Sequence, residues 1–282
     1  MTETQSIILP TIAILGAGSM GRAILSGLQN PRVTVEGGIR VTNRTRERAR
    51  EFAGVPGITA FATEEEGDAN RLAVDGAEIV LVAVKPHMVP DLLREIADSV
   101  TPGAVIVSVA AGVTTATFES HLPATVSVVR SMPNTPAIVG RAVTGISGGH
   151  RSAPDDLAVV RTLFETVGEV VEVPESKLDA LSTISGSGPA YVFYLIEQLT
   201  ATAVDKGFTP AQARQLVHGT FLGASELLVA SGEDPAELRR RVTSPNGTTE
   251  RAIGVLESAD LKALFDRATD AALARARELA QS

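Results

Sequence analysis

Short apolar runs alternate with amphipathic stretches along the first part of the chain. Near-continuous apolar runs bounded by polar turns are typical of buried parallel strands. The expected strands cover residues 12–15, 38–42, 78–84, 104–109, 125–130, 140–147 and 170–173. Helices are expected between them, at 22–28, 46–53, 89–100 and 153–166. Strands alternating with helices predict a doubly wound α/β domain that ends near Val173.

The pattern changes near Pro174, and from Lys177 onward it is helical with no convincing strand. Helices are expected at 176–184, 188–206, 210–230, 234–243, 248–257 and 260–280. Their apolar faces suit either a small core or contact between subunits, because long helices after a nucleotide domain often pair between subunits. The sequence therefore predicts two domains, 1–173 and 174–282.

Composition narrows the functional classes. The 282 residues are 44% hydrophobic and 21% charged, as in ordinary globular proteins. A net charge of −8 and the lack of tryptophan argue against a nucleic-acid partner. The chain has no cysteine, its four histidines lack metal-ligand spacing, and its apolar runs are too short to span a bilayer. We therefore expect a cytoplasmic protein with no metal and no membrane partner.

A glycine turn follows the first predicted strand. Gly16, Gly18 and Gly21 form a G-x-G-x-x-G pattern between the strand at 12–15 and the helix at 22–28, an order typical of dinucleotide binding. The three glycines would permit the tight turn, the approach of a pyrophosphate and close helix packing, respectively. Free N–H groups at the start of the helix would face the phosphates. The alternative is a glycine-rich surface turn.

The end of the second strand bears on cofactor choice. An NAD-selective site usually has an acidic residue there to hold the ribose 2′-hydroxyl, but this chain has Asn43 and then Arg44. A guanidinium suits a 2′-phosphate, which a carboxylate would repel. We therefore expect NADPH, with NADH as the alternative cofactor. The other interpretation of Arg44 is that it begins a solvated basic helix.

Other polar groups lie where chemistry is expected. Lys85 follows an apolar strand at the sheet edge where ligands bind, although it could simply reach water. The Pro133–Pro136 segment is expected to be a rigid turn with exposed polar groups. The stretch 244–249 precedes a helix, so it could be either an ordinary N-cap or a carboxylate site.

Four further motifs follow the glycine turn in order. They are Val84-Lys85-Pro86, Met132-Pro133-Asn134-Thr135-Pro136, Ser185-Gly186-Ser187-Gly188-Pro189-Ala190-Tyr191 and Ser244-Pro245-Asn246-Gly247-Thr248-Thr249. Together they resemble the pyrroline-5-carboxylate reductase family, over residues 12–279. The resemblance implies an N-terminal Rossmann domain and a C-terminal all-helical dimerisation domain in which two subunits interleave; some members of the family form decamers. It also implies NAD(P)H-dependent reduction of 1-pyrroline-5-carboxylate to L-proline, the final step of proline biosynthesis.

The resemblance also implies site residues. The cofactor-binding set is Leu15, Gly16, Ala17, Gly18, Ser19, Met20, Asn43, Arg44, Thr45, Asn70, Ala83, Val84, Lys85, Pro86, Val109, Ala110 and Ala111. The substrate-binding set is Glu175, Ser244, Gly247, Thr248 and Thr249. Ser244 and the N–H groups of Gly247 and Thr248 would hold the substrate carboxylate. The Thr249 hydroxyl would hydrogen-bond the ring nitrogen and is the expected catalytic group.

The chain departs from the family pattern at Asn246, where glycine is usual. Asparagine tolerates the left-handed conformation better than most residues, so we expect the turn to survive. Two rival functions are considered. A dehydrogenase of the 3-hydroxyisobutyrate type should place a lysine in a site motif of its second half, where Lys177, Lys206 and Lys262 offer none. An NADP-sensing module would bind the cofactor without turnover.

Overall fold

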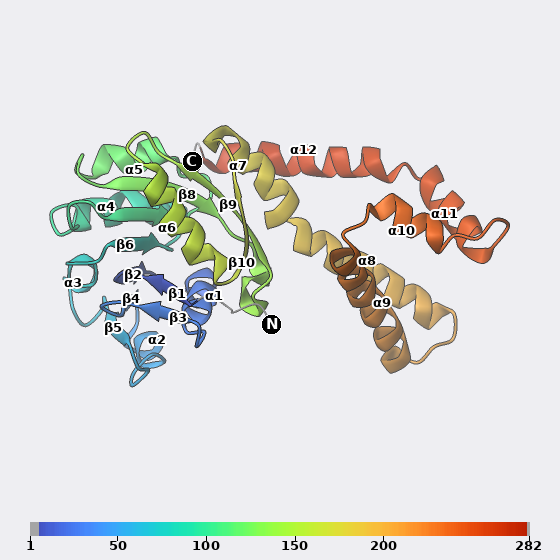
Figure 1. Cartoon of the computed structure of the whole chain (residues 1–282), viewed down its shortest axis with the longest axis horizontal. Coiled ribbons are helices and arrows are strands. Elements are labelled where there is room, and N and C mark those ends of the chain that lie inside the picture. Colours follow the sequence, from blue (N-terminus) through green and yellow to red (C-terminus); the bar gives the residue numbers. More distant parts are fainter. Residues whose placement is uncertain (1–5, 281–282) are drawn as a thin grey trace. The chain divides into compact units, whose positions relative to one another are not determined.

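The computed structural model describes residues 6–280, and the strands of its N-terminal part form an eight-stranded sheet (Figure 1). The strand order is β10-β9-β8-β7-β6-β2-β4-β5, and only β8 and β9 pair antiparallel. The strands are β2 (Ile12–Leu15), β4 (Ile39–Asn43), β5 (Ile58–Ala62), β6 (Ile79–Val82), β7 (Val105–Ser108), β8 (Ser127–Met132), β9 (Ala142–Gly148) and β10 (Gly168–Glu172). A separate parallel pair joins β1 (Ile7–Leu9) to β3 (Val33–Val35).

The strands alternate their side chains between two apolar cores, one on each face of the sheet. Ile12 and Ile14 of β2 belong to one core, whereas Ala13 and Leu15 belong to the other. Successive side chains of a strand point to opposite faces, so a strand buried on both sides reads as a continuous apolar run. This confirms the predicted fold class, a doubly wound α/β sheet with a helical C-terminal part.

Helices cover both faces of the sheet (Figure 1). They are α1 (Ser19–Leu28), α2 (Arg46–Arg50), α3 (Ala69–Val74), α4 (Val89–Ile96), α5 (Thr115–His121) and α6 (Pro154–Glu165), with short 3₁₀ turns η1 (Pro86–Met88) and η2 (Thr135–Val139). Helices α1 and α6 supply one core, and α3, α4 and α5 supply the other. Each helix therefore buries one stripe and leaves the opposite side in water.

The strand order reverses beside β2. The chain proceeds from β2 to β4 and β5 on one side, then returns to place β6 against the other side of β2. In open parallel sheets, ligands bind beyond the carboxyl ends of the strands at this point of reversal. The segments that follow β2 and β6 are the glycine turn and Ala83–Lys85.

The remainder of the chain is helical. It comprises α7 (Glu175–Leu181), a π-helix η3 (Ser182–Gly186), α8 (Gly188–Asp205), α9 (Pro210–Ser231), α10 (Pro235–Arg241), α11 (Thr248–Ser258) and α12 (Leu261–Ala280). The chain divides into two compact units: one runs to Ser187 and includes the residues from Leu273 onward, and the other is Gly188–Ala272. The division between units thus falls later than the change from strands to helices near Pro174.

Helix α7 belongs with the sheet because its leucines pack on β9. A Cβ added to Gly145 would lie 2.6 Å from Leu181 Cδ1 and 2.9 Å from Leu178 Cδ2, which shows how closely the helix approaches the strand. Two sequence-based expectations are corrected nearby. Ser185 and Gly186 were expected between two helices but lie in the π-helix that continues α7, and only the turn at Ser187 separates it from α8. Asn134 is only 7% exposed, so within the Pro133–Pro136 turn only Thr135, and not Asn134, presents its side chain to solvent.

In the unit Gly188–Ala272 the helices bury few apolar side chains. Helices α8 and α9 pack together, and α9 buries Ala213 and Val217, whereas α8, α10 and α11 bury no residue. None of the helices in the described part of the chain combines the length and apolarity needed to cross a bilayer.

Candidate active site

The glycine turn after β2 has the geometry of a tight loop. Gly16 has φ +83°, a conformation that L-residues with a Cβ rarely adopt, and its N–H donates to the Thr42 carbonyl oxygen at 3.1 Å. A Cβ on Gly16 would lie 2.7 Å from Val84 Cγ1. Glycine is therefore required here by both backbone conformation and the neighbouring segment after β6.

Gly18 and Gly21 meet different demands. A Cβ on Gly18 would approach no atom of the chain closer than 4.0 Å, so the space beside it is open. Gly18 is also the N-cap of α1 and has no side chain with which to cap the helix. A Cβ on Gly21 would lie 3.3 Å from the Gly16 carbonyl oxygen, so this glycine permits close packing of helix on strand. An open cradle at an uncapped helix N-terminus suits a phosphate.

Arg22 holds the turn from the side. Its Nε donates to the Ala17 carbonyl oxygen at 3.2 Å, and its guanidinium pairs with Glu51 and lies over the ring of Phe52. The hydrogen bond from Arg22 lowers the pKa of Glu51, and the same bond raises the pKa of Arg22. Sequence reasoning gave Arg22 no role, because its partners come from a different part of the chain.

The end of β4 presents one buried and one exposed polar side chain. Asn43 is 4% exposed, and its Nδ2 has no partner in the part of the chain that the structure describes. Arg44 is exposed and forms no ion pair with any described residue, whereas Arg46 pairs with Glu65 at 3.0 Å. Thr45 Oγ1 caps α2 by accepting from the Arg48 N–H. Arg44 is thus the guanidinium at this strand end that no neighbouring carboxylate neutralises.

Most of the remaining predicted cofactor residues lie at the same edge of the sheet. Ala83, Val84, Lys85 and Pro86 follow β6, and Lys85 is exposed. Val109, Ala110 and Ala111 follow β7. Asn70 lies instead on α3, where its Nδ2 donates to both carboxylate oxygens of Glu95 at 3.1 Å. The glycine cradle, the open helix N-terminus and the unpaired Arg44 together fit a dinucleotide with a 2′-phosphate.

The predicted substrate residue Glu175 occupies a network of its own. Its Oε1 accepts from the Thr115 N–H at 2.7 Å, and its Oε2 accepts from Thr115 Oγ1 at 2.8 Å. Arg130, 6% exposed, approaches Glu175 Oε1 at 3.5 Å and donates to Asp179 at 2.6 Å. Both oxygens of Glu175 thus tie α7 to the start of α5 and to β8. Its role near a substrate stays a prediction.

The other predicted substrate residues share one turn before α11. Asn246 has φ +59°, so the expectation that asparagine would take the left-handed conformation is confirmed. The Gly247 N–H donates to the Ser244 carbonyl oxygen at 3.0 Å, which engages one of the predicted carboxylate donors within the turn. Gly247 is the N-cap of α11 and provides no side-chain cap. The N–H groups of Thr248 and Thr249 therefore begin the helix uncapped.

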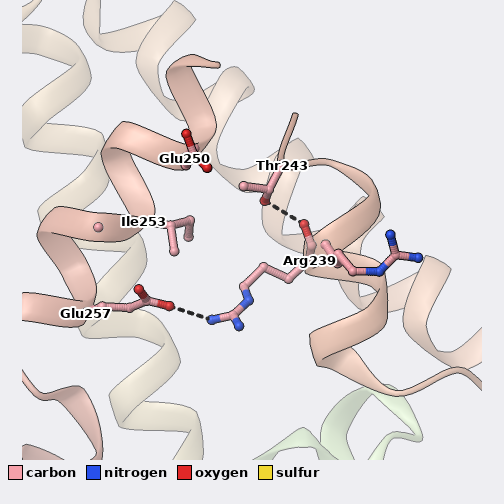
Figure 2. A pocket seen from close by; sticks show the side chains of 7 residues that line it. Arg239, Thr243, Glu250, Ile253 and Glu257 are labelled. Atoms are coloured by element: carbon pink, nitrogen blue, oxygen red, sulfur yellow. Dashed lines mark hydrogen bonds and ion pairs between the residues drawn. The ribbon is translucent and has the colours of Figure 1, made fainter. Parts of the chain in front are cut away.

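A pocket of about 320 Å³ lies beside this turn, between α10 and α11 (Figure 2). Arg239 pairs with Glu257 at 3.2 Å, and Thr243 Oγ1 donates to the Arg239 carbonyl oxygen at 2.6 Å. The hydrogen bond from Arg240, followed in size of effect by the one from Arg241, lowers the pKa of Glu237 to about 2. The arginines of α10 are therefore paired with carboxylates and are not free to bind an anion.

One residue at the turn escaped sequence reasoning. Glu250 Oε2 accepts from the Asn246 N–H at 2.8 Å. This bond links the first turn of α11 to the turn that precedes the helix. A glutamate three residues after a helix N-cap was the available signal, because this spacing occurs in capping boxes. Among the residues that the structure describes, no group of three or more potential metal ligands was found.

Comparisons with known proteins place this geometry in a family. A family model described as pyrroline-5-carboxylate reductase dimerisation matches residues 175–279. A second model, described as NADP oxidoreductase coenzyme F420-dependent, matches residues 11–112. The two models cover the helical part and the glycine-turn part of the chain respectively. They support an NADP-type cofactor domain and a homo-oligomeric protein.

Relatives extend the match along the chain. A pyrroline-5-carboxylate reductase from Corynebacterium melassecola is 38% identical, over 96% of this chain and 99% of that protein. The solved structure of a pyrroline-5-carboxylate reductase from Coxiella burnetii is 36% identical, with a TM-score of 0.86 over 95% of this chain and 97% of that one. A Plasmodium falciparum pyrroline carboxylate reductase with NADP bound shares the fold, with a TM-score of 0.80 at 23% identity, over 96% of this chain and 98% of that one. On this near-complete similarity, the chain belongs to the pyrroline-5-carboxylate reductase family.

Proposed function

We propose that this chain catalyses the NAD(P)H-dependent reduction of 1-pyrroline-5-carboxylate to L-proline, the final step of proline biosynthesis. The observation that carries the proposal is that one chain of this family has both a glycine cradle at an uncapped helix and a second uncapped helix start in the Ser244–Thr249 turn. The first suits a phosphate and the second suits a small carboxylate.

The cofactor-binding residues are those of the sheet edge. The backbone of residues 15–20 would receive the pyrophosphate, Asn43 to Thr45 the 2′-phosphate side of the ribose, and the segments after β6 and β7 the nicotinamide end. Asn70 would contribute from α3, with its amide held by Glu95. When bound, the cofactor supplies the hydride. Because Arg44 is unneutralised by any described carboxylate, NADPH is preferred and NADH is the weaker alternative.

The substrate is an anionic ring with an imine, so it needs a carboxylate site and a group at its nitrogen. Ser244 and the N–H groups at the start of α11 hold the carboxylate, and Gly247 contributes by sharing the N–H that now bonds Ser244. Thr249 then serves the nitrogen, because a hydroxyl can accept from a protonated imine or donate to the product amine. The chain thereby orients the ring and favours the protonated nitrogen.

The assembly and location are also part of the proposal. A dimer is the basic unit, since the matched dimerisation model spans the helices that bury few residues in the single chain. Assembly into a decamer is the larger alternative. We place the protein in the cytoplasm, in line with its lack of cysteine. We expect no nucleic-acid partner, in line with its net charge of −8, and no membrane partner.

The test is NADPH oxidation by the purified full chain with 1-pyrroline-5-carboxylate, together with detection of proline. We expect turnover that requires both compounds. Fluorescence titration of NADPH in parallel separates the alternatives, because a sensing module would bind NADPH without turnover. If the protein oxidised a 3-hydroxy acid with NADP⁺ and did not reduce the imine, the result would instead support the rival dehydrogenase.

A further inference from the structure

The turn before α11 contains a residue in an unfavourable backbone conformation. Asn246 has φ +59°, one of two positive-φ non-glycine residues in the described part of the chain. This region costs most L-residues about 1–2 kcal/mol, and asparagine less, so the turn needs a contact that holds it there. The neighbouring Gly247 cannot be replaced freely, because a Cβ there would lie 2.9 Å from the Ser244 carbonyl oxygen.

Glu250 provides such a contact. Its Oε2 accepts from the Asn246 N–H at 2.8 Å, which is a charge-assisted hydrogen bond to the strained residue itself. The second bond across the turn, from the Gly247 N–H to the Ser244 carbonyl oxygen, lies within the backbone. Glu250 thus contributes the side-chain bond that closes the turn onto the first turn of α11.

The surroundings leave Glu250 free for this role. Figure 2 shows Glu250 and Glu257 on the same helix, and the ion pair with Arg239 goes to Glu257. Glu250 forms no ion pair within the described residues, and its negative charge lies near the positive end of the α11 dipole. Any anionic substrate at this helix start would meet a like charge there, so a purely electrostatic account of Glu250 predicts weaker substrate binding rather than stronger.

We propose that Glu250 is a positioning residue that fixes the Ser244–Thr249 turn through the Asn246 N–H. The Glu250 bond holds Asn246 in the left-handed conformation, and that conformation sets the direction of the N–H groups of Gly247 and Thr248. On the function proposed above, these groups receive the substrate carboxylate, so Glu250 acts on substrate affinity without touching the substrate.

Hydrogen exchange of the full chain without ligand tests the structural step directly. In Glu250→Ala, the amides of residues 244–249 should exchange about three- to tenfold faster than in the unmodified protein, as expected for loss of one hydrogen bond. Glu250→Gln keeps an acceptor and should exchange like the unmodified protein. Unchanged exchange in Glu250→Ala would overturn the proposal, and so would equal acceleration in both variants.

Steady-state kinetics test the consequence. Glu250→Ala should raise KM for 1-pyrroline-5-carboxylate about three- to tenfold while leaving kcat and NADPH affinity within about twofold, because the loss concerns substrate binding. Glu250→Gln should keep KM at or below the original value, since it removes the like charge and retains the acceptor. A lower KM in Glu250→Ala would show that repulsion outweighs positioning and would overturn the proposal.

The Asn246→Gly background provides the matched control. Glycine takes positive φ without strain, so the turn no longer depends on the Glu250 bond. In this background, Glu250→Ala should change exchange and KM by less than about twofold; a full effect there would show that Glu250 acts elsewhere. If the unmodified chain fails to reduce the imine, the proposed function is wrong, and the exchange comparison alone decides whether Glu250 fixes the turn.

Discussion

Two glycines of the same turn should respond to alanine in opposite ways. Gly16 has φ +83°, and a Cβ there would lie 2.7 Å from Val84 Cγ1 and 3.3 Å from the Ala83 carbonyl oxygen. Gly18 has φ −73°, and the nearest chain atom to a Cβ there would be the Gly16 carbonyl oxygen at 4.0 Å. Alanine should therefore damage the fold at the first position and leave it intact at the second.

The magnitudes follow from these geometries. For Gly16→Ala, the left-handed conformation costs about 1–2 kcal/mol and the overlap with Val84 about 1–3 kcal/mol, so the free energy of unfolding should fall by roughly 2–5 kcal/mol. Gly18→Ala should change it by less than about 1 kcal/mol, because a compatible backbone gains from the less flexible unfolded state and loses a little at the N-cap.

For cofactor binding, the larger direct effect is expected from Gly18→Ala rather than from Gly16→Ala. The Gly18 Cβ would occupy the space through which a pyrophosphate reaches the start of α1. Loss of one charge-assisted hydrogen bond there corresponds to about 1.5–3 kcal/mol, so Kd for NADPH should rise roughly 10- to 100-fold in a folded protein. Gly16→Ala should lose NADPH binding only in proportion to the fraction of the protein that is unfolded.

Urea unfolding followed by circular dichroism gives the first quantity, and fluorescence titration of NADPH gives the second. Gly54→Ala is a matched control for strain alone, because Gly54 has φ +78° with no atom within 4 Å of an added Cβ. The reasoning would be refuted by a Gly18→Ala protein that binds NADPH normally. It would also be refuted by a Gly16→Ala protein no less stable than Gly54→Ala.

Three further outcomes are expected. Arg44→Ala should weaken NADPH binding by about 1–3 kcal/mol and leave NADH almost unchanged in cofactor titrations, whereas equal losses would show that Arg44 does not contact the 2′-phosphate. Thr249→Val should lower kcat/KM for 1-pyrroline-5-carboxylate by about 1–3 kcal/mol without changing NADPH affinity, and normal turnover would remove Thr249 from the catalytic role. Sedimentation at low micromolar concentration should show a dimer or a larger species, which a stable and active monomer would contradict.

The sheet could be predicted where burial was complete. Strands β2, β6 and β7 are buried at every position, so their sequences are continuous apolar runs. Strand β5 was missed because it lies at the sheet edge and buries only Ala62 fully. Helices α3 and α5 were missed because each is a single short element, Ala69–Val74 and Thr115–His121, too brief for a helical period to appear.

Long-range hydrogen bonds explain the errors at the site. Asn134 was expected to be exposed, but its side chain bonds the Ser185 carbonyl oxygen 51 residues away and the Val143 N–H nine residues away. Asn70 is similarly held by Glu95, and Glu175 by Thr115. Local patterns contain no information on such partners. By contrast, the left-handed Asn246 was predictable, because that conformation is a property of the residue and its turn.

The helical unit shows why an accurate pattern can still leave the core undefined. The predicted helices at 188–206 and 210–230 match α8 and α9 closely. Yet Phe193 is 67% and Tyr194 is 60% exposed, and the neighbouring Val192 and Leu195 are exposed as well. Four consecutive residues of a helix point in four directions around its axis, so α8 is apolar on nearly every side. Its packing against α9 and the ring contact of Tyr191 with Phe265 of α12 cover only part of this surface. A helix that is apolar all round needs partners on all sides, and we expect a second copy of the chain to provide them in a homo-oligomer.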